Sequence, residues 1–427
     1  MFKKIIQSIL ESYVKKYFLT HSEVKLIAVA GSVGKTSSKH AIATILSERY
    51  RIRMQEGNHN TELAAPCSVL GITYPKSLRN PLAWMKVFLA AKKRVSEPAD
   101  VDVIIQELGT DHPGDIANFG RYLKPNIAVV TAVTPEHMEF FGTLDEVAKE
   151  ELSISDFSSF TFINRDDVDG RFADFESNPN FATYGSTGAA EYRFETSDFS
   201  RENGYKGNII TPEFPKGFEA NMHVLGEHSI RSVIAGVAVA VKLGLSPEEI
   251  RTGVSKIQAV PGRMNALRGI GETVVIDDSY NSSPAAAEAA LRTLYGFDEA
   301  SQRIAVFGDM RELGSMSRAA HETLASMCDP NLLAWIVTVG PDMEQFFTPI
   351  AKQRGCQVKN CRDAIQAAEF VRSVSKPGAV ILVKGSQNTI YLEETVKLLI
   401  ENRDDEKLVR QSDAWKLTKE KYFSQYY

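Results

Sequence analysis

The chain has 427 residues, 43% of them hydrophobic and 24% charged, and a formal net charge of −5. This length exceeds one ordinary hydrophobic core, so we expect two or three globular domains. The acidic balance argues against a nucleic-acid-binding surface, which would be basic, and we expect a monomer without a nucleic-acid partner. The four cysteines show no metal-ligand spacing, which fits reduced thiols and a cytoplasmic location. No apolar run reaches the roughly 18 residues of a membrane-spanning helix.

Residues 1–23 form a predicted N-terminal amphipathic helix. Apolar residues recur at helical spacing between positions 2 and 14, with four lysines close by. Two interpretations stay open: the helix docks on its own domain, or it makes peripheral contact with a membrane surface. We favour docking, because helical apolar stripes usually mark buried faces.

Between residues 24 and 260, short apolar runs alternate with helical stretches, which predicts an α/β domain with a mostly parallel sheet. Residues 190–222 are polar, aromatic and rich in turn residues, which predicts a small antiparallel excursion. The predicted strands are Val24–Ala30, Val101–Gln106, Ile127–Val133 and Phe160–Ile163, and the predicted helices include Thr36–Glu48 and Ser229–Leu243.

A second strand–helix series follows Pro261-Gly262, and it predicts a separate Rossmann-like, doubly wound domain over residues 261–427. Proline and glycine together between the two series predict a hinge there. The predicted strands of this domain are Thr273–Asp277, Arg303–Phe307, Trp335–Val339 and Ala379–Val383.

The first predicted strand runs into a glycine loop and then a helix, which predicts a P-loop-type phosphate site in the central domain. The glycines let the backbone fold around an anion, and the N–H groups at the helix start point at it. Lys35 can neutralise the β- and γ-phosphates of ATP, and the Thr36 hydroxyl can bind Mg²⁺. The predicted ATP-binding residues of this loop are Gly31, Ser32, Val33, Gly34, Lys35, Thr36 and Ser37.

The Gly-x-x-Gly-Lys-Thr loop in this context resembles that of the Mur ligase family, whose superfamily also includes folylpolyglutamate synthetase and the C-terminal part of cyanophycin synthetase. Members join a carboxylate to an amine through an acyl phosphate made from ATP. The resemblance runs from residue 24 to about residue 400. The family's N-terminal domain, which grips the UDP end of the substrate, has no counterpart in the pattern, and we expect only a helix before residue 24.

Two strand ends carry the residues that the resemblance identifies as metal ligands. Glu107 ends an apolar strand and is followed by residues similar to the family's Glu-x-Gly-x-x-x-Pro-Gly-Asp/Glu-Ile pattern. A carboxylate there lies at the sheet edge that also carries the phosphate loop. His137 takes the position of the family's metal-binding histidine. The resemblance therefore implies Mg²⁺ binding by Thr36, Glu107 and His137.

The family's carbamylated lysine aligns with Glu151. A carbamate puts negative charge beside the metal, and a glutamate supplies similar charge without modification. We hypothesise that Glu151 replaces the carbamate; the alternative is a carbamylated Lys149.

Asn60 and Thr61 lie in a stretch, residues 58–62, that resembles the family's Asn-x-Asn-(Asn/Thr)-Glu. They are expected near the acceptor carboxylate and the γ-phosphate, the alternative being a capped loop that enters a helix. In the C-terminal domain, Gly262-Arg263 resembles the family's Gly-Arg. The resemblance implies that Arg263 reaches the ATP phosphates and stabilises charge during phosphoryl transfer.

Residues 277–286 and 308–314 resemble most closely the branch of the family that adds D-alanyl-D-alanine. The first stretch implies contacts of Asp278 and Asn281 with the ribose and base region of ATP. Lys384 and Ser386, in a Lys-Gly-Ser turn, are expected near the incoming amine.

The resemblance as a whole implies an ATP-dependent peptide ligase of cell-wall biosynthesis that needs Mg²⁺. Its expected substrates are a UDP-linked muramoyl peptide and D-alanyl-D-alanine, and its expected catalytic residues are Lys35, Glu151 and Arg263. Two alternatives stay open. One is a ligase of the same superfamily for another acid and amine, and the other is an inactive P-loop binding protein.

Overall fold

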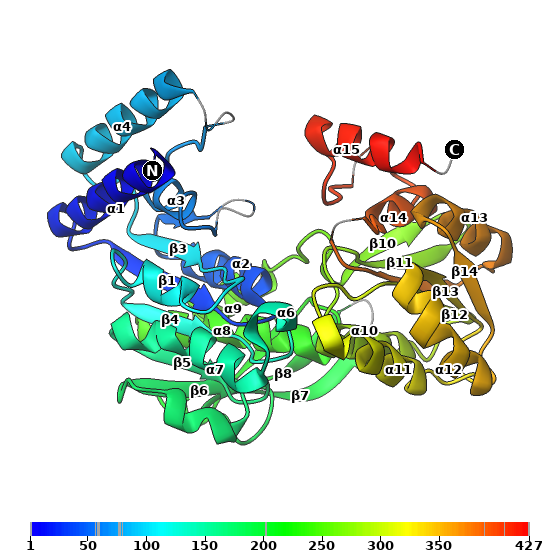
Figure 1. The fold of residues 1–427 in the computed structure, drawn as a ribbon. Coiled ribbons are helices and arrows are strands. Elements are labelled where there is room, and N and C mark those ends of the chain that lie inside the picture. Colours follow the sequence, from blue (N-terminus) through cyan, green and yellow to red (C-terminus); the bar gives the residue numbers. More distant parts are fainter. Residues whose placement is uncertain are drawn as a thin grey trace. The chain divides into compact units, whose positions relative to one another are not determined.

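The computed structural model describes residues 2–55, 57, 60–75, 78, 80–200, 203–387, 389–404 and 406–425. Two compact units make up the chain (Figure 1). Unit 1 comprises residues 1–134, 140–223 and 229–257, and unit 2 comprises residues 135–139, 224–228 and 258–427. The main boundary lies just before the predicted Pro261-Gly262 hinge. The predicted N-terminal helix is part of unit 1, whereas the short segment around His137 belongs to unit 2.

In the described part of unit 1, a nine-stranded sheet has the order β2-β3-β1-β4-β5-β6-β7-β8-β9. Neighbouring strands are parallel from β2 to β7 and antiparallel from β7 to β9. The predicted parallel sheet and its antiparallel excursion are therefore confirmed. The strands are β1 (Lys25–Ala30), β2 (Ile52–Met54), β3 (Val103–Glu107), β4 (Ile127–Val130), β5 (Thr161–Asn164), β6 (Phe181–Gly185), β7 (Tyr192–Ser200), β8 (Gly204–Ile210) and β9 (Phe218–Met222).

Strand β1 lies where the strand order reverses, with β3 on one side and β4 on the other. All its residues after Lys25 are buried, as expected of a parallel strand covered on both faces. Open parallel sheets bind ligands at such a reversal, beyond the carboxyl ends of the strands. The α-helices with at least half of their residues in unit 1 are α1 (Phe2–Thr20), α2 (Lys35–Leu46), α3 (Ala65–Leu70), α4 (Pro81–Ser96), α5 (Asp115–Phe119), α6 (Met138–Phe141), α7 (Leu144–Leu152), α8 (Glu227–Lys242) and α9 (Pro247–Ser255).

Helix α1 buries Ile6, Leu10 and Val14 inside unit 1, whereas Ile5 is 52% exposed. Ile6 and Leu10 form a cluster with Cys67 of α3 and Trp84 of α4, and Figure 1 shows α1 and α4 side by side. This part of the stripe therefore packs within the protein, as docking predicts. Among the described residues, no helix combines the length and the apolar character needed to cross a bilayer.

Unit 2 contains a six-stranded sheet of order β10-β11-β15-β12-β13-β14 in its described part, and only the β10–β11 pair is antiparallel. The strands are β10 (Asn265–Gly269), β11 (Thr273–Asp278), β12 (Gln302–Gly308), β13 (Trp335–Val339), β14 (Val358–Cys361) and β15 (Ala379–Lys384). The α-helices are α10 (Pro284–Tyr295), α11 (Ser317–Ser326), α12 (Thr348–Gln353), α13 (Ala364–Val374), α14 (Glu393–Leu399) and α15 (Asp413–Phe423).

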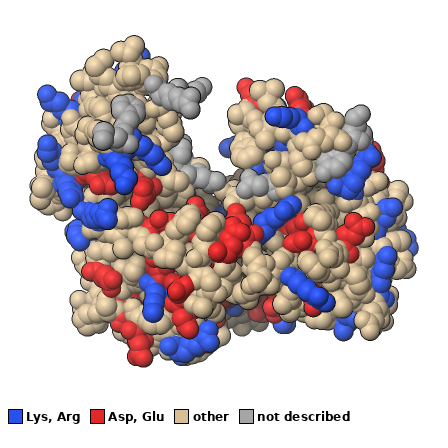
Figure 2. All heavy atoms as spheres, viewed as in Figure 1, with Lys and Arg blue, Asp and Glu red and all other residues tan. Residues whose placement is uncertain are grey.

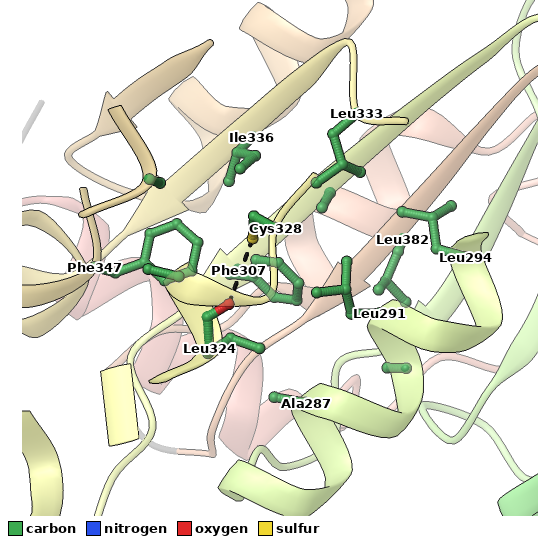
Figure 3. Close-up of a cluster of buried hydrophobic side chains, with 14 of the residues drawn as sticks. Ala287, Leu291, Leu294, Phe307, Leu324, Cys328, Leu333, Ile336, Phe347 and Leu382 are labelled. Atoms are coloured by element: carbon green, nitrogen blue, oxygen red, sulfur yellow. Dashed lines mark hydrogen bonds between the residues drawn. The ribbon is translucent and has the colours of Figure 1, made fainter. Parts of the chain in front are cut away.

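Helices cover both faces of this sheet. Successive residues of a strand point to opposite faces of the sheet, so each strand contributes side chains to two hydrophobic cores. Ile276 and Phe307 pack in the core that includes α10 and α11 (Figure 3), whereas Val275 and Val306 pack in the core that includes α13 and α14. This confirms the predicted doubly wound α/β domain.

Acidic and basic side chains are interspersed on the face drawn in Figure 2. Although the chain has a net charge of −5, its acidic side chains therefore do not form one continuous patch on that face. All four cysteines are buried as free thiols.

Leu291 of α10 is fully buried in the core drawn in Figure 3. We expect Leu291→Ala to lower the free energy of unfolding of unit 2 by about 2–5 kcal/mol, through lost apolar burial and a residual cavity. Leu417→Ala, at a side chain 67% exposed on α15, should change it by less than about 0.5 kcal/mol. Urea unfolding followed by tryptophan fluorescence measures both, because Trp335 and Trp415 lie in unit 2. Equal effects of the two substitutions would contradict this core.

Candidate active site

The predicted phosphate loop lies between the end of β1 and the start of α2. Gly31 and Gly34 have positive φ angles of 124° and 86°, which glycine adopts without a side-chain penalty. Because α2 begins at Lys35, its first N–H groups, which lack partners within the helix, lie at this loop. The loop therefore has the form of an anion-binding helix start.

Residues that follow β4 hold this loop in shape. A Cβ atom at Gly31 would lie 2.2 Å from Oγ1 of Thr131, so only glycine fits there. The Thr131 hydroxyl donates to the carbonyl oxygen of Val33 at 2.6 Å, and the N–H of Ser32 donates to that of Ala132 at 2.9 Å. Ser32 thus uses its N–H group to fix the loop rather than to face a ligand.

Lys35, Thr36 and Glu107 meet at the start of α2. The Lys35 ammonium donates to two carbonyl oxygens of the loop. The Thr36 hydroxyl lies 3.1 Å from Oε2 of Glu107, whose carboxylate also pairs with the Lys39 ammonium at 3.2 Å. Glu107 and Lys39 are both buried. The structure therefore brings the predicted phosphate lysine and two predicted metal ligands to one place.

Glu151 lies on α7 and is buried against the phosphate loop. Its Oε2 accepts a hydrogen bond of 2.6 Å from the N–H of Gly31. The neighbouring Glu150 has a different task, because it accepts from the N–H groups of Gly114 and Ile116 at the start of α5. Only the second carboxylate of this pair puts negative charge beside the loop.

Asn60 and Thr61 line a cavity of about 200 Å³ in unit 1. Gly109, two residues beyond Glu107, lies against Asn60 so closely that a Cβ atom there would be 2.5 Å from Nδ2 of Asn60. The cavity therefore continues from the strand end that carries Glu107. Asn58, the first residue of the 58–62 stretch, lies outside the described residues. The other lining residues are Lys3, Glu62, Leu63, Asp111, Asp115 and Phe119.

In unit 2, Asp278 ends β11 and Lys384 ends the neighbouring strand β15. Nζ of Lys384 lies 2.6 Å from Oδ2 of Asp278 and donates to the carbonyl oxygen of Asn281 at 3.1 Å. Ser386 donates to the carbonyl oxygen of Ser282 and accepts from the N–H of Arg311. Lys384 and Ser386 are each only 1% exposed. Both therefore hold the turn after β11 in this arrangement.

Arg263 lies beside the same turn. Its guanidinium carbon is 4.4 Å from the ring centroid of Tyr280, a cation–π contact. The adjacent Gly262 donates its N–H to Asp277, a fully buried carboxyl whose pKa burial raises to about 6. The loop before β10 and the turn after β11 thus form one hydrogen-bonded assembly that carries Arg263, Asp278 and Asn281.

His137 belongs to unit 2, whereas the other two predicted metal ligands, Thr36 and Glu107, belong to unit 1. Its Nδ1 lies 2.9 Å from Oε2 of Glu312, and this hydrogen bond holds the pKa of the Glu312 carboxyl below its usual value. A carboxylate partner on one ring nitrogen is typical of histidines that bind metal through the other. Among the described residues, no cluster of three or more His, Cys, Asp or Glu side chains forms a ready-made cage.

Sequence reasoning missed three residues of this site. Lys39 follows Lys35 by four residues, so the two lysines lie on the same face of α2. This spacing was the signal in the sequence that could have identified Lys39. Gln55, buried beside β3, accepts from the N–H of Glu107 at 2.8 Å, and no local pattern marks it. Glu312 lies in the quoted 308–314 stretch, but its pairing with His137 depends on the fold.

Comparison with family models covers both units. Residues 29–240 match the model described as the Mur ligase middle domain, and residues 262–387 match the one described as the Mur ligase, glutamate ligase domain.

Curated proteins are similar to this chain over most of its length, and a solved structure shares its fold. The UDP-N-acetylmuramoyl-tripeptide--D-alanyl-D-alanine ligase of Bacillus subtilis is 25% identical over 401 residues, which cover 91% of this chain and 78% of that protein. The Escherichia coli enzyme of that name is 26% identical over 393 residues, covering 88% and 77%. The structure of MurF ligase from Thermotoga maritima in complex with ADP matches with a TM-score of 0.74 at 21% identity, over 93% of this chain and 83% of that one.

Gly31→Ala tests the loop. The substitution forces alanine into a positive φ and against Thr131, a strain of about 1–3 kcal/mol. We expect the affinity for ADP, measured by calorimetry, to fall about 10- to 100-fold. Gly188→Ala is the matched control, because a Cβ there meets no atom within 4 Å. Equal affinities of the two variants would contradict the role of the loop.

Proposed function

Because the chain belongs to the Mur ligase family, we propose that it is an ATP-dependent ligase that joins a UDP-linked muramoyl tripeptide to D-alanyl-D-alanine. The observation that carries the reaction class is the convergence of Lys35, Thr36, Glu107 and Glu151 on one phosphate loop. The substrate pair is supported by the similarity, over about nine-tenths of the chain, to ligases named for these substrates.

The phosphate loop binds the triphosphate of ATP. The N–H groups at the start of α2 bind phosphate oxygens, and the helix dipole favours their charge. Lys35 turns from the loop carbonyls to the β- and γ-phosphates, where its charge offsets the charge that grows on the transferring group. ATP then phosphorylates the tripeptide carboxylate, which gives ADP and an acyl phosphate.

The residues present fit a magnesium ion. Mg²⁺ prefers oxygen ligands and is usually held by one or two carboxylates together with substrate phosphates and water. Thr36 and Glu107 offer a hydroxyl and a carboxylate within 3.1 Å of each other at the loop. Lys39 neutralises Glu107 in this structure. When bound, the ion supplies positive charge to the phosphates, and we assign His137 to a second ion position.

Glu151 supplies the negative charge that the family obtains from a carbamylated lysine. Its burial and its bond to Gly31 place this charge at the loop without any modification. Lys149 lies on another face of α7 and has its ammonium 5.3 Å from the ring centroid of Phe175. This geometry favours Glu151 over a carbamylated Lys149.

Asn60 and Thr61 hold the tripeptide end of the acid substrate in the cavity beside Glu107. In unit 2, Asp278 and Asn281 bind the nucleoside part of ATP, and Arg263 contacts its phosphates. Lys384 and Ser386 belong to the separate Lys-Gly-Ser turn after β15, which receives D-alanyl-D-alanine. The amine of the dipeptide attacks the acyl phosphate, and the tetrahedral intermediate collapses to the amide and phosphate. We further propose that the protein acts as a cytoplasmic monomer.

Phosphate release tests the reaction. A mixture of the protein, ATP, Mg²⁺, the UDP-muramoyl tripeptide and D-alanyl-D-alanine should release one phosphate for each amide formed, because both arise from the same acyl phosphate. Lys35→Ala should lower kcat by about 100-fold or more, since the phosphoryl group loses its main cation. Omitting either organic substrate is the control.

A panel of acids and amines in the same assay separates the alternatives. Turnover only with a different acid and amine would assign the chain to another branch of the superfamily. ATP binding with no turnover on any pair would identify a binding protein and contradict the proposed ligase.

Glu151→Gln tests the charge beside the loop. Glutamine can still accept from the N–H of Gly31 but carries no charge, so we expect kcat to fall by about 100-fold. Glu150→Gln is the matched control, because this neighbouring buried carboxylate bonds to α5 and not to the loop. Full activity of Glu151→Gln would refute the hypothesis, as would carbamylated Lys149 in the mass spectrum of the intact protein.

A further inference from the structure

The C-terminal segment Leu408–Phe423 matches no motif, yet one of its side chains is deeply built into unit 2. The side chain of Arg410 is only 6% exposed. Its guanidinium forms an ion pair with the fully buried carboxylate of Glu393 at the start of α14. Nε lies 2.9 Å from Oε1, and Nη2 lies 2.8 Å from Oε2. This two-pronged pairing is the strong, directional form of an arginine–carboxylate bond.

The same guanidinium also binds the turn after β11. Nη2 of Arg410 donates to the carbonyl oxygen of Ser279 at 2.9 Å, and Nη1 donates to that of Tyr280 at 3.0 Å. These carbonyls directly follow Asp278 in the chain. One planar guanidinium group therefore ties the backbone of the turn to helix α14.

Two further contacts link this segment to Arg263. The Tyr280 ring has the Arg263 guanidinium 4.4 Å and the Arg410 guanidinium 5.6 Å from its centroid. A Cβ atom at Gly262 would lie 2.9 Å from Cγ1 of Val409 and 3.1 Å from Cβ of Tyr280, so these side chains pack directly on the residue before Arg263. The C-terminal segment thus contacts the loop before β10 and the turn after β11, which carry the predicted nucleotide-binding residues.

A second cation anchors the segment without reaching the turn. Nζ of Lys419 on α15 lies 3.5 Å from Oε1 of Glu393, and it also pairs with Glu394. Two basic residues of the C-terminal segment therefore share the buried carboxylate of Glu393. Of these two residues, only Arg410 contacts both Glu393 and the turn after β11. Its planar guanidinium presents several N–H donors in fixed directions.

We propose that Arg410 is a positioning residue for the nucleotide: it sets the turn Ser279–Asn281 and the Tyr280 ring on which Arg263 rests. The backbone of Arg410 has a positive φ of 52°, which a residue with a side chain rarely adopts, and the contacts with Glu393 and the turn hold it there. This role rests on the proposed function, because it presupposes that unit 2 binds the nucleoside of ATP.

The test compares Arg410→Ala, Arg410→Lys and Lys419→Gln in the full-length protein. Lys419→Gln is the matched control, because it weakens the same anchor but touches no atom of the turn. The readouts are the affinity for ADP with Mg²⁺ by calorimetry, the KM values for ATP and for the amine, and the melting temperature. Each variant is assayed well below its own melting temperature, so that unfolding does not contribute.

We expect Arg410→Ala to weaken ADP binding and to raise the KM for ATP by about tenfold or more, with the KM for the amine unchanged. Arg410→Lys should not restore ADP binding, because a single ammonium cannot bridge the carboxylate and both carbonyls. Lys419→Gln should bind ADP within about twofold of the unaltered protein.

Equal nucleotide affinity of Arg410→Ala and the unaltered protein would overturn the inference, as would an equal loss in Lys419→Gln, which would indicate a structural role only. An unaltered protein that binds ADP but forms no amide would refute the ligase and leave the role of Arg410 measurable. An unaltered protein that binds no ADP would refute both.

Discussion

The close approach of Gly31 to Thr131 is the constraint on which the site depends. A side chain at Gly31 would collide with the threonine hydroxyl, and that hydroxyl fixes the loop by donating to Val33. The contact exists because β1 and β4 are neighbours in a parallel sheet and end at the same edge. Strand order thus determines where α2 starts, and with it where its N–H groups point.

The charges around this loop support the proposed magnesium ion. Glu107 and Glu151 are both buried beside the loop that we propose to bind phosphate, and a carboxylate beside phosphate is repulsive. Lys39 offsets one of them, and Lys35 lies on the loop itself. The two lysines are already matched by these two carboxylates, so bound phosphates would leave excess negative charge, and a magnesium ion at Thr36 and Glu107 would offset part of it.

Much of the fold was predictable from the sequence, because buried parallel strands such as β1 are continuous apolar runs and the phosphate loop has a local pattern. Strand β2 could not be predicted from the sequence, because Ile52–Met54 is short and has an arginine at its centre. The contact of Glu151 with Gly31 and the role of Arg410 could not be predicted from the sequence. Their partners, Gly31 and Glu393, are distant in the chain or unmarked by any motif, so the contacts exist only once the sheets have formed.

Calorimetric titration with ADP, with Mg²⁺ present and then with EDTA in its place, tests the central claim that this loop binds phosphate together with a cation. We predict that removing Mg²⁺ weakens binding by about tenfold or more, and that Glu107→Gln abolishes most of this difference. The same affinity for ADP with and without Mg²⁺ would contradict the account.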